Sequence, residues 1–165
     1  MKVLVLSDTH IPTNADTLPE RVIEEAKKCD CIVHAGDFVS SQVLEQLEKF
    51  AKTYGVAGNM DGEKIRRRLP KKQVFQLEEI LIGLFHGRGS PFRIVQTVEE
   101  EFSDASKDID MYIFGHSHVP YHEKKGGKIF FNPGSATDSV FAPYPSFGLL
   151  EIHGNSVNAR IEKIG

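Results

Sequence analysis

Apolar positions along the chain follow two different spacings, and each spacing predicts one kind of element. Short runs rich in β-branched and aromatic residues predict strands at residues 3–7, 31–35, 53–57, 74–77, 80–85, 111–114, 128–131, 147–152 and 157–161. Longer stretches carry apolar residues every three or four positions and predict helices at residues 18–28, 40–52 and 90–102. Ser40 or Ser41 is available as an N-cap for the middle helix.

The order of these elements predicts the fold class. Strand and helix alternate in the first half of the chain, an order typical of parallel strands joined by crossover helices. After Gly115 the apolar runs are short and separated by Gly, Pro and Asn, which favours antiparallel strands. No repeat, low-complexity tract or linker interrupts the pattern. We therefore expect a single α/β domain over residues 1–165 with a mixed sheet system.

The composition narrows the class of protein. Apolar residues make up 40% and charged residues 26%, which is an ordinary globular mixture. The formal net charge of −3, from 20 basic and 23 acidic side chains, argues against a protein that coats nucleic acid, so we expect no stable nucleic-acid partner. No apolar run approaches the roughly 20 residues that span a bilayer, and the first residues do not resemble a secretory signal. We expect no membrane partner and a cytoplasmic location. Cys29 and Cys31 are spaced like neither a redox pair nor a zinc site, and we expect them to be buried filler.

Polar side chains follow most of the predicted strands, at the points where the strands end. These side chains are Asp8 and His10, Asp37, Asn59 and Asp61, His86, His116 and His118, and Asn132. Ligands of open α/β sheets bind at the carboxyl ends of the strands, because the connecting loops meet there. Each residue alone has a simpler role as a helix cap, a turn former or a hydrogen-bonded partner. A metal-free polar rim is the alternative for the whole set, but crowded carboxylates and imidazoles favour a cation among them.

The types of donor indicate which cation. Carboxylates, imidazoles and one amide, without a thiolate, suit divalent manganese, iron, nickel, cobalt or zinc. The donors are too many for one tetrahedral ion, and they suit two ions that share a carboxylate about 3.5–4 Å apart. In an extended segment the side chains of Asp8 and His10 would point the same way, so both would reach one ion. His116 and His118 would reach one ion each.

The ordered blocks "DTH", "GD", "GNMD", "HG" and "GHSH" resemble the motifs of the calcineurin-like metallophosphoesterases, in particular the small single-domain phosphodiesterases of bacteria and archaea. The resemblance implies a four-layer αββα sandwich of two mixed β-sheets flanked by helices. It implies that Asp8, His10 and His118 hold one metal ion, that Asn59, His86 and His116 hold a second, and that Asp37 bridges the two. Mn²⁺ is the first expectation for both ions, with Ni²⁺, Fe²⁺, Co²⁺ or Zn²⁺ as alternatives.

The implied activity is hydrolysis of a small phosphate ester, most of all a phosphodiester, by in-line attack of a hydroxide that bridges the metals. Asp37, Asn59, His86 and Arg88 are the expected catalytic residues. Many relatives have a histidine where this chain has Met60, and a thioether cannot donate a proton. Arg88 stands where the family often has a second histidine. It is either a phosphate clamp or a solvated loop residue.

Several alternatives stay open at this point. One relative with this fold is a trafficking scaffold subunit, so a non-catalytic interaction protein competes with the enzyme. A phosphomonoesterase or a nuclease of the same family also fits. Residues 64–72 form the main basic cluster and are expected to be a solvated helix end and turn, with a subunit contact or a phosphate-steering patch as the less favoured alternative. Phe141, Tyr144 and Phe147 are expected to form an exposed apolar patch and a homo-oligomer contact.

Overall fold

The computed structural model describes residues 1–105 and 108–165, whose strands form two sheets of five. The first sheet has the order β10-β9-β1-β2-β3. Its strands are β1 (Lys2–Leu6), β2 (Cys31–His34), β3 (Lys52–Gly55), β9 (Ser146–His153) and β10 (Ser156–Lys163). β1, β2 and β3 run parallel, with Val5 opposite Val33, whereas β9 is antiparallel to both of its neighbours.

The second sheet has the order β4-β5-β6-β8-β7. Its strands are β4 (Lys72–Leu77), β5 (Ile80–Phe85), β6 (Met111–Ile113), β7 (Tyr121–Lys125) and β8 (Lys128–Asn132). β5, β6 and β8 run parallel, and the outer strands β4 and β7 pair with them as antiparallel hairpins. The alternating first half therefore yields parallel strands in both sheets, but the expectation of parallel strands is wrong for β4. The expectation of antiparallel strands after Gly115 fails in turn for β8, which pairs in parallel with β6.

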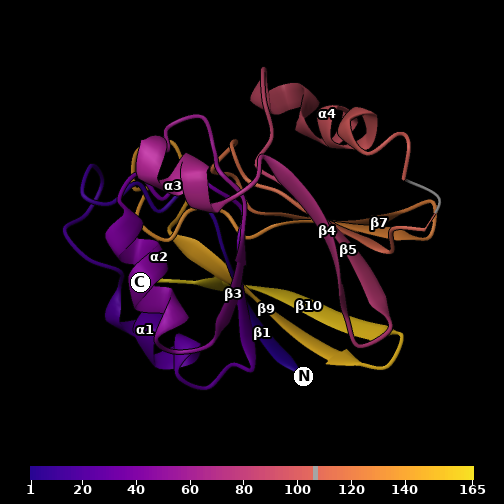
Figure 1. Cartoon of the computed structure of the whole chain (residues 1–165), viewed down its shortest axis with the longest axis horizontal. Coiled ribbons are helices and arrows are strands. Elements are labelled where there is room, and N and C mark those ends of the chain that lie inside the picture. Colours follow the sequence, from indigo (N-terminus) through magenta and orange to yellow (C-terminus); the bar gives the residue numbers. More distant parts are fainter. Residues whose placement is uncertain (106–107) are drawn as a thin grey trace.

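Helices cover the outer faces of both sheets (Figure 1). They are α1 (Glu20–Ala26), α2 (Ser41–Glu48), α3 (Glu63–Arg68), the 3₁₀ helix η1 (Pro91–Arg93) and α4 (Ile94–Glu101). Ser40 caps α2, since its hydroxyl accepts the backbone N–H of Gln42 at 3.2 Å. In the described ranges, no helix combines the length and the apolar character needed to cross a membrane.

The period-two alternation of β1 produces the layers. Val3 and Val5 belong to the apolar cluster between the two sheets, together with Ile82 and Ile113. Leu4 and Leu6 face the opposite way and pack with residues of α1 and α2. A third cluster joins α4 to the outer face of the second sheet through Val98, Phe102, Tyr112 and Phe130. The molecule is thus the expected αββα sandwich, with its core in three slabs.

Some predicted elements need correction. β7 has no counterpart among the predicted strands, because four of its five residues are exposed and it lacks an apolar run. β3 spans residues 52–55 rather than 53–57, and the Ala57 N–H pairs with the carbonyl of Pro70 instead of continuing the sheet. The basic stretch is the exposed end of α3 and the turn after it, as predicted.

The predicted apolar patch is wrong. Phe147 is fully buried in the slab between the first sheet and its helices. Tyr144 is half-buried, with the Lys163 ammonium 4.0 Å from its ring centroid. Phe141 is exposed beside the exposed Val140, but the predicted surface of Phe141, Tyr144 and Phe147 does not form. β9 begins at Ser146, one residue earlier than predicted, and Phe147 lies within this strand as expected, but its side chain faces the core instead of the surface.

Candidate metal centre

The loops after five strands of both sheets meet at one rim of the sandwich. Asp8 and His10 follow β1, Asp37 follows β2, Asn59 follows β3, His86 follows β5, and His116 and His118 follow β6. The two sheets are joined there by direct hydrogen bonds: the His116 N–H donates to Asp8 Oδ2 at 3.0 Å, and His86 Nδ1 donates to the Ala35 carbonyl at 2.8 Å. Each of the seven predicted ligands lies in these loops.

The carboxylates of Asp8 and Asp37 lie among the imidazoles. Asp8 Oδ1 is 3.4 Å from His118 Nε2, 3.8 Å from His10 Nε2 and 3.9 Å from His86 Nε2. Asp37 Oδ2 is 3.4 Å from His10 Nε2 and 3.3 Å from His86 Nε2. Two sets of donor atoms each fall within 4.8 Å of one another: Asp8, His10 and His118 in one, and Asp8, Asp37 and His86 in the other. The first set coincides with the predicted ligands of one ion.

Both carboxylates use one oxygen for the protein and present the other to the centre. Asp8 Oδ2 accepts the Ser7 hydroxyl at 2.6 Å and the His116 N–H, while Asp8 Oδ1 is buried and has no hydrogen-bond partner. Asp37 Oδ1 accepts the Met60 N–H at 2.8 Å, while Oδ2 faces the imidazoles. His10 Nε2 is likewise buried without a hydrogen-bond partner. Buried polar atoms without partners are costly, so these atoms fit coordination of a cation.

Three histidines have one ring nitrogen fixed by the protein, which leaves the other for the centre. His86 Nδ1 donates to the Ala35 carbonyl, His118 Nδ1 donates to Asp138, and His116 Nε2 donates to the Gly89 carbonyl at 2.8 Å. Such outer hydrogen bonds select the tautomer and orient the ring of a metal ligand. The donor set therefore fits a metal centre in its supporting contacts as well as in its composition.

Asn59 joins the centre through its amide oxygen. Asn59 Oδ1 is 3.0 Å from His86 Nε2 and 3.2 Å from His116 Nδ1. When His116 Nε2 carries the proton for Gly89, the Nδ1 lone pair faces an oxygen that is also an acceptor. A cation shared by Asn59, His86 and His116 would satisfy all three atoms. The structure thus brings these three predicted ligands together at the Asp37 side of the centre.

The negative field of the carboxylates is strong enough to hold a proton on a buried imidazole. Burial would lower the pKa of His86, but the carboxylates of Asp8 and Asp37 raise it to about 9. Burial would raise the pKa of Asp8, but the nearby rings of His86, His10 and His118 lower it to about 2. Burial would raise the pKa of Asp37 as well, but His86 lowers it, so both carboxylates are charged at neutral pH and favour a bound cation.

The backbone of the centre is bent into an uncommon conformation. Five of the seven described non-glycine residues with positive φ are predicted ligands, namely Asp8, His10, Asp37, His116 and His118, with φ between 41° and 69°. Each such residue costs of order 1–3 kcal/mol unless its surroundings compensate, and these residues cluster at functional sites. The expected extended geometry of "DTH" is therefore wrong: Asp8 and His10 converge because both are left-handed, not because they alternate along a strand.

Gly115 allows the two sheets to approach at the centre. A Cβ atom at this position would lie 1.8 Å from Ser7 Oγ and 2.6 Å from Asp8 Oδ2. No real Cβ contact is that short, so a side chain would displace the Asp8 carboxylate. The glycine next to the "GHSH" histidines is thus required by close packing.

Two supporting residues escaped the sequence reasoning. Asp138 is buried, pairs with His118 Nδ1 through Oδ2, and accepts the N–H groups of Val140 and Phe141 through Oδ1. Burial would raise the pKa of Asp138, but His118 and these backbone donors lower it. Ser7 holds Asp8, as described above. Asp138 sits six residues beyond the end of β8, deep in an irregular Ser- and Thr-containing loop, so no pattern identified it.

Asp61 fixes the position of the Asp37 loop. Its carboxylate accepts the N–H groups of Asp37 at 2.9 Å, Val39 at 2.8 Å and Gly58 at 2.8 Å. Asn132 holds the other loop: its amide donates to the Gly115 carbonyl and to Ser117 Oγ, both at 3.0 Å, and its oxygen accepts the Gly134 N–H. Asn132 therefore shapes the "NPG" turn and supports the "GHSH" loop, but it does not contact a ligand ring.

Other residues singled out in the sequence have simpler places. His34 is a buried core residue that pairs with Thr9 Oγ1 and the Gly36 N–H. Cys29 and Cys31 are buried and free, as expected. Arg88 has a largely exposed side chain that pairs with Glu101. Met60 is 56% exposed at the rim, with no proton to offer a leaving group.

Two back-to-back mixed sheets, with carboxylates and imidazoles gathered where their loops meet, define a metal-binding phosphoesterase-type sandwich. The chain belongs to the calcineurin-like phosphoesterase superfamily, whose domain model matches residues 1–155. A protein of Methanothermobacter thermautotrophicus described as a probable metallophosphoesterase is 33% identical over 165 residues, which is 100% of this chain and 94% of the relative.

Solved structures share the fold over the whole chain. Vps29 from Entamoeba histolytica in complex with Zn²⁺ has a TM-score of 0.79 and 26% identity, covering 99% of this chain and 98% of Vps29. A structure described as a novel archaeal phosphodiesterase has a TM-score of 0.73 and 23% identity, covering 98% of this chain and 100% of the neighbour. The second likeness concerns the fold alone.

Proposed function

We propose that the protein is a phosphodiesterase that uses two divalent metal ions. In this proposal Asp8, His10 and His118 hold one ion, Asn59, His86 and His116 hold the other, and Asp37 lies between them. The observation that carries the proposal is the pair of buried atoms without partners, Asp8 Oδ1 and His10 Nε2, within a ring of donors contributed by both sheets. Mn²⁺ is the first choice for these oxygen and nitrogen donors, and Ni²⁺, Fe²⁺, Co²⁺ and Zn²⁺ suit them as well.

Bound divalent ions would supply a nucleophile at neutral pH and neutralise charge on the phosphoryl oxygens. The chain's own groups orient the substrate. Asn59 and His86 line the rim where a phosphoryl group would lie, and the amide N–H groups of Asn59 would favour its negative oxygens. Asp37 holds its loop through the Met60 N–H and keeps Oδ2 turned to the centre.

Proton delivery to the leaving group has no evident donor at position 60. Met60 occupies that position at the exposed rim, and a thioether cannot act as a general acid. General acid catalysis contributes roughly 10²–10⁴ in rate, so esters with acidic leaving groups should be the faster substrates. Diesters and monoesters both meet this condition, and the choice of diester follows the family resemblance.

A scaffold protein is the competing function, because Vps29 has the same fold. Since that Vps29 structure contains Zn²⁺, metal binding alone does not separate the two functions. The discriminating property is turnover. Here every expected ligand position has a competent donor, which favours the enzyme.

The test crosses a metal panel with a substrate panel on metal-stripped protein. Mn²⁺, Ni²⁺, Co²⁺, Zn²⁺ and Mg²⁺ are each added before assays with bis(p-nitrophenyl) phosphate and p-nitrophenyl phosphate. We expect metal-dependent release of nitrophenol, faster from the diester, and loss of both ions and of activity in Asp37→Asn. His122→Asn is the matched control, since His122 is exposed on β7. Turnover of neither ester with any metal would contradict the enzyme, and two ions retained by Asp37→Asn would contradict the shared carboxylate.

A further inference from the structure

A cavity opens beside the Asn59 side of the metal centre. Its volume is about 660 Å³, within the range of roughly 300–1,000 Å³ typical of pockets for small organic ligands. Asn59 and His86 form part of its wall. A substituent on a phosphoryl group held by these two residues therefore reaches into the cavity.

The remaining walls combine apolar and cationic groups. Leu69, Pro70 and Phe85 supply apolar surface, and Arg66, Lys71 and Arg88 supply three positive charges against the one negative charge of Glu101. The whole chain has a formal charge of −3, so this local excess of positive charge is opposite in sign to the molecule. An anionic ligand with an organic framework fits such a lining.

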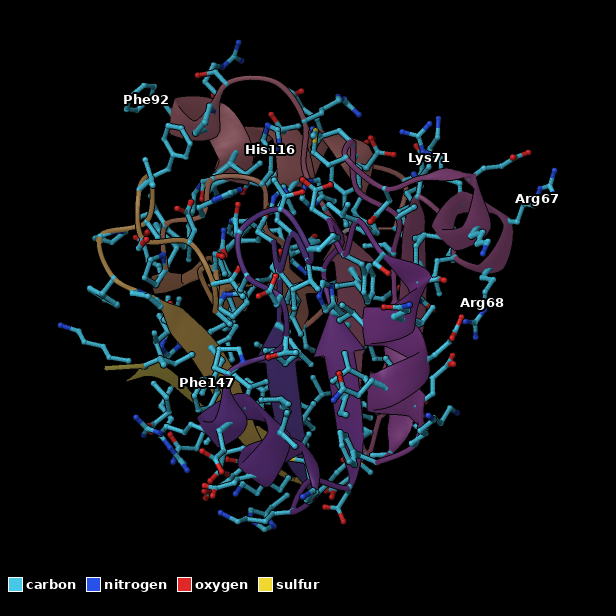
Figure 2. All side chains as sticks on the ribbon, turned by 90° about the vertical axis from the view of Figure 1, so that its left-hand side faces the viewer. Arg67, Arg68, Lys71, Phe92, His116 and Phe147 are labelled. Carbon is cyan, nitrogen blue, oxygen red and sulfur yellow. The ribbon has the colours of Figure 1, made fainter. Side chains whose placement is uncertain are left out.

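The three cations differ in how far they are already neutralised. Arg88 pairs with Glu101, which also lies 3.2 Å from Lys72 Nζ. Arg66 donates to the Asn59 carbonyl at 3.1 Å, a partner with no formal charge. No ion pair or hydrogen bond of the Lys71 ammonium occurs within the described ranges, and Lys71 is exposed. Figure 2 shows Lys71 at the same end of the molecule as His116, with Arg67 farther out on α3.

We infer that this cavity binds one ester group of the substrate, and that this group carries a second anionic substituent such as a further phosphate. The apolar wall accommodates the carbon framework of a nucleoside-sized group, while Lys71 and Arg66 contact the second anion. This inference rests on the proposed function, because it places the reacting phosphoryl group beside Asn59 and His86. It narrows the substrate class from phosphodiesters in general to diesters with a second negative charge.

The test uses two chromogenic diesters that differ by one phosphate. Thymidine 5′-(p-nitrophenyl phosphate) and its 3′-phosphorylated counterpart have the same leaving group and the same reacting linkage. A hydrogen bond to a charged group is worth about 10-fold or more in affinity, so we expect at least that preference in kcat/KM for the 3′-phosphorylated ester. Lys71→Ala should reduce this ratio several-fold and leave only the part of the preference that Arg66 supplies.

Arg67→Ala is the matched control, because it removes the same charge from α3 while its pairing with Glu63 lies outside the cavity. It should keep the wild-type preference. Equal kcat/KM for the two esters in the wild type, or an unchanged ratio in Lys71→Ala, would overturn the inference. Lys71 is exposed, and a melting curve for each variant verifies that the fold is intact.

Failure of the proposed function is recognised separately. If the metal-loaded protein hydrolyses neither ester, calorimetric titration of the metal-free protein with thymidine 3′,5′-bisphosphate tests the cavity directly. Binding that weakens about 10-fold in Lys71→Ala but not in Arg67→Ala would support the cavity. Undetectable binding, or equal affinity in both variants, would refute it.

Discussion

Gly58→Ala should damage the metal centre through one added methyl group. Gly58 follows β3, and a Cβ atom there would lie 2.1 Å from Asp37 Oδ1, 2.5 Å from the Asp37 nitrogen and 2.8 Å from its Cγ. Real Cβ atoms essentially never come closer than 3.0 Å, so the methyl group and Oδ1 must separate by about 0.9 Å. Rotation of the Asp37 side chain cannot relieve the contact with the backbone nitrogen, and the loop itself has to shift.

The size of the effect follows from that displacement. Overpacking of this kind costs typically 1–3 kcal/mol of stability. A shift of about 1 Å in a catalytic group can cost roughly 10²-fold in rate. We therefore expect kcat/KM to fall about 100-fold and metal affinity to weaken about 10–100-fold, since Asp37 Oδ2 moves together with Oδ1. Metal affinity is measured by isothermal titration calorimetry and activity with bis(p-nitrophenyl) phosphate.

Gly62→Ala is the control for this variant. Gly62 lies in the same loop as Gly58 and is the N-cap residue of α3. A Cβ atom at Gly62 would meet nothing within 4 Å. The control should keep its metal affinity and activity, at a capping cost of about 1 kcal/mol or less. Wild-type metal affinity and turnover in a folded Gly58→Ala protein would refute the view that Asp37 is held in place by close packing against Gly58.

Four further predictions test the supporting structure. Asp138→Asn should weaken metal binding about 10–100-fold, because His118 loses its charged partner. The control Asp16→Asn should keep the wild-type affinity. Equal metal affinity of the two variants by calorimetry would exclude the supporting role of Asp138. Burial lowers the pKa of His34 to about 3, whereas the same histidine in the unfolded chain has a pKa of about 6.5. Below that pH the unfolded chain binds more protons than the folded chain. The free energy of unfolding should therefore fall with decreasing pH by up to about 1.4 kcal/mol per pH unit. In urea titrations of the metal-free proteins between pH 7.5 and 5, the free energy of unfolding of His34→Gln should fall less steeply than that of the wild type. Identical slopes for the two proteins would contradict this prediction. Adding metal at 100 times its dissociation constant should stabilise the metal-stripped protein by about 2.7 kcal/mol. This corresponds to a rise of roughly 5–10 °C in the calorimetric melting temperature. An unchanged melting temperature would argue against a preformed centre. Because Met60 cannot protonate a leaving group, rates across a series of aryl diesters should fall steeply as the leaving-group pKa rises; a flat dependence with chemistry rate-limiting would show that another acid acts.

Much of the fold could be predicted because its strands are buried and strongly patterned. β1, β2 and β5 are apolar runs that end at a polar residue, so their presence and their ends could be inferred from local sequence. β7 could not be inferred, because it is an exposed outer strand whose partner β8 supplies the pairing. The exposure of Phe147 was predicted wrongly for a related reason: its strand was expected, but only the packing of the first sheet against its helices decides that this side chain is buried.

The predicted ligands follow from a different kind of signal. Asp8, Asp37 and His86 each stand within three residues of the end of a strand, and this is a local property of the sequence. Asp138 lies farther into the loop after β8 and acts by contact with His118, which is 20 positions away along the chain. A residue of that kind becomes visible only when the loops are placed in space.

The sequence by itself determined which residues can donate to a cation and that they follow successive strands, because side-chain chemistry and apolar spacing are local properties. The tertiary structure decided how the donors converge. Left-handed backbone at Asp8, His10, His116 and His118, and the approach of Gly115 to Ser7, orient the side chains toward one centre. The tertiary structure also decided which oxygen of each carboxylate is left for a cation, since Ser7 and the His116 N–H occupy only Oδ2 of Asp8. The His116 N–H bond to Asp8 and the approach of Gly115 to Ser7 join the two sheets, and no spacing along the chain encodes them.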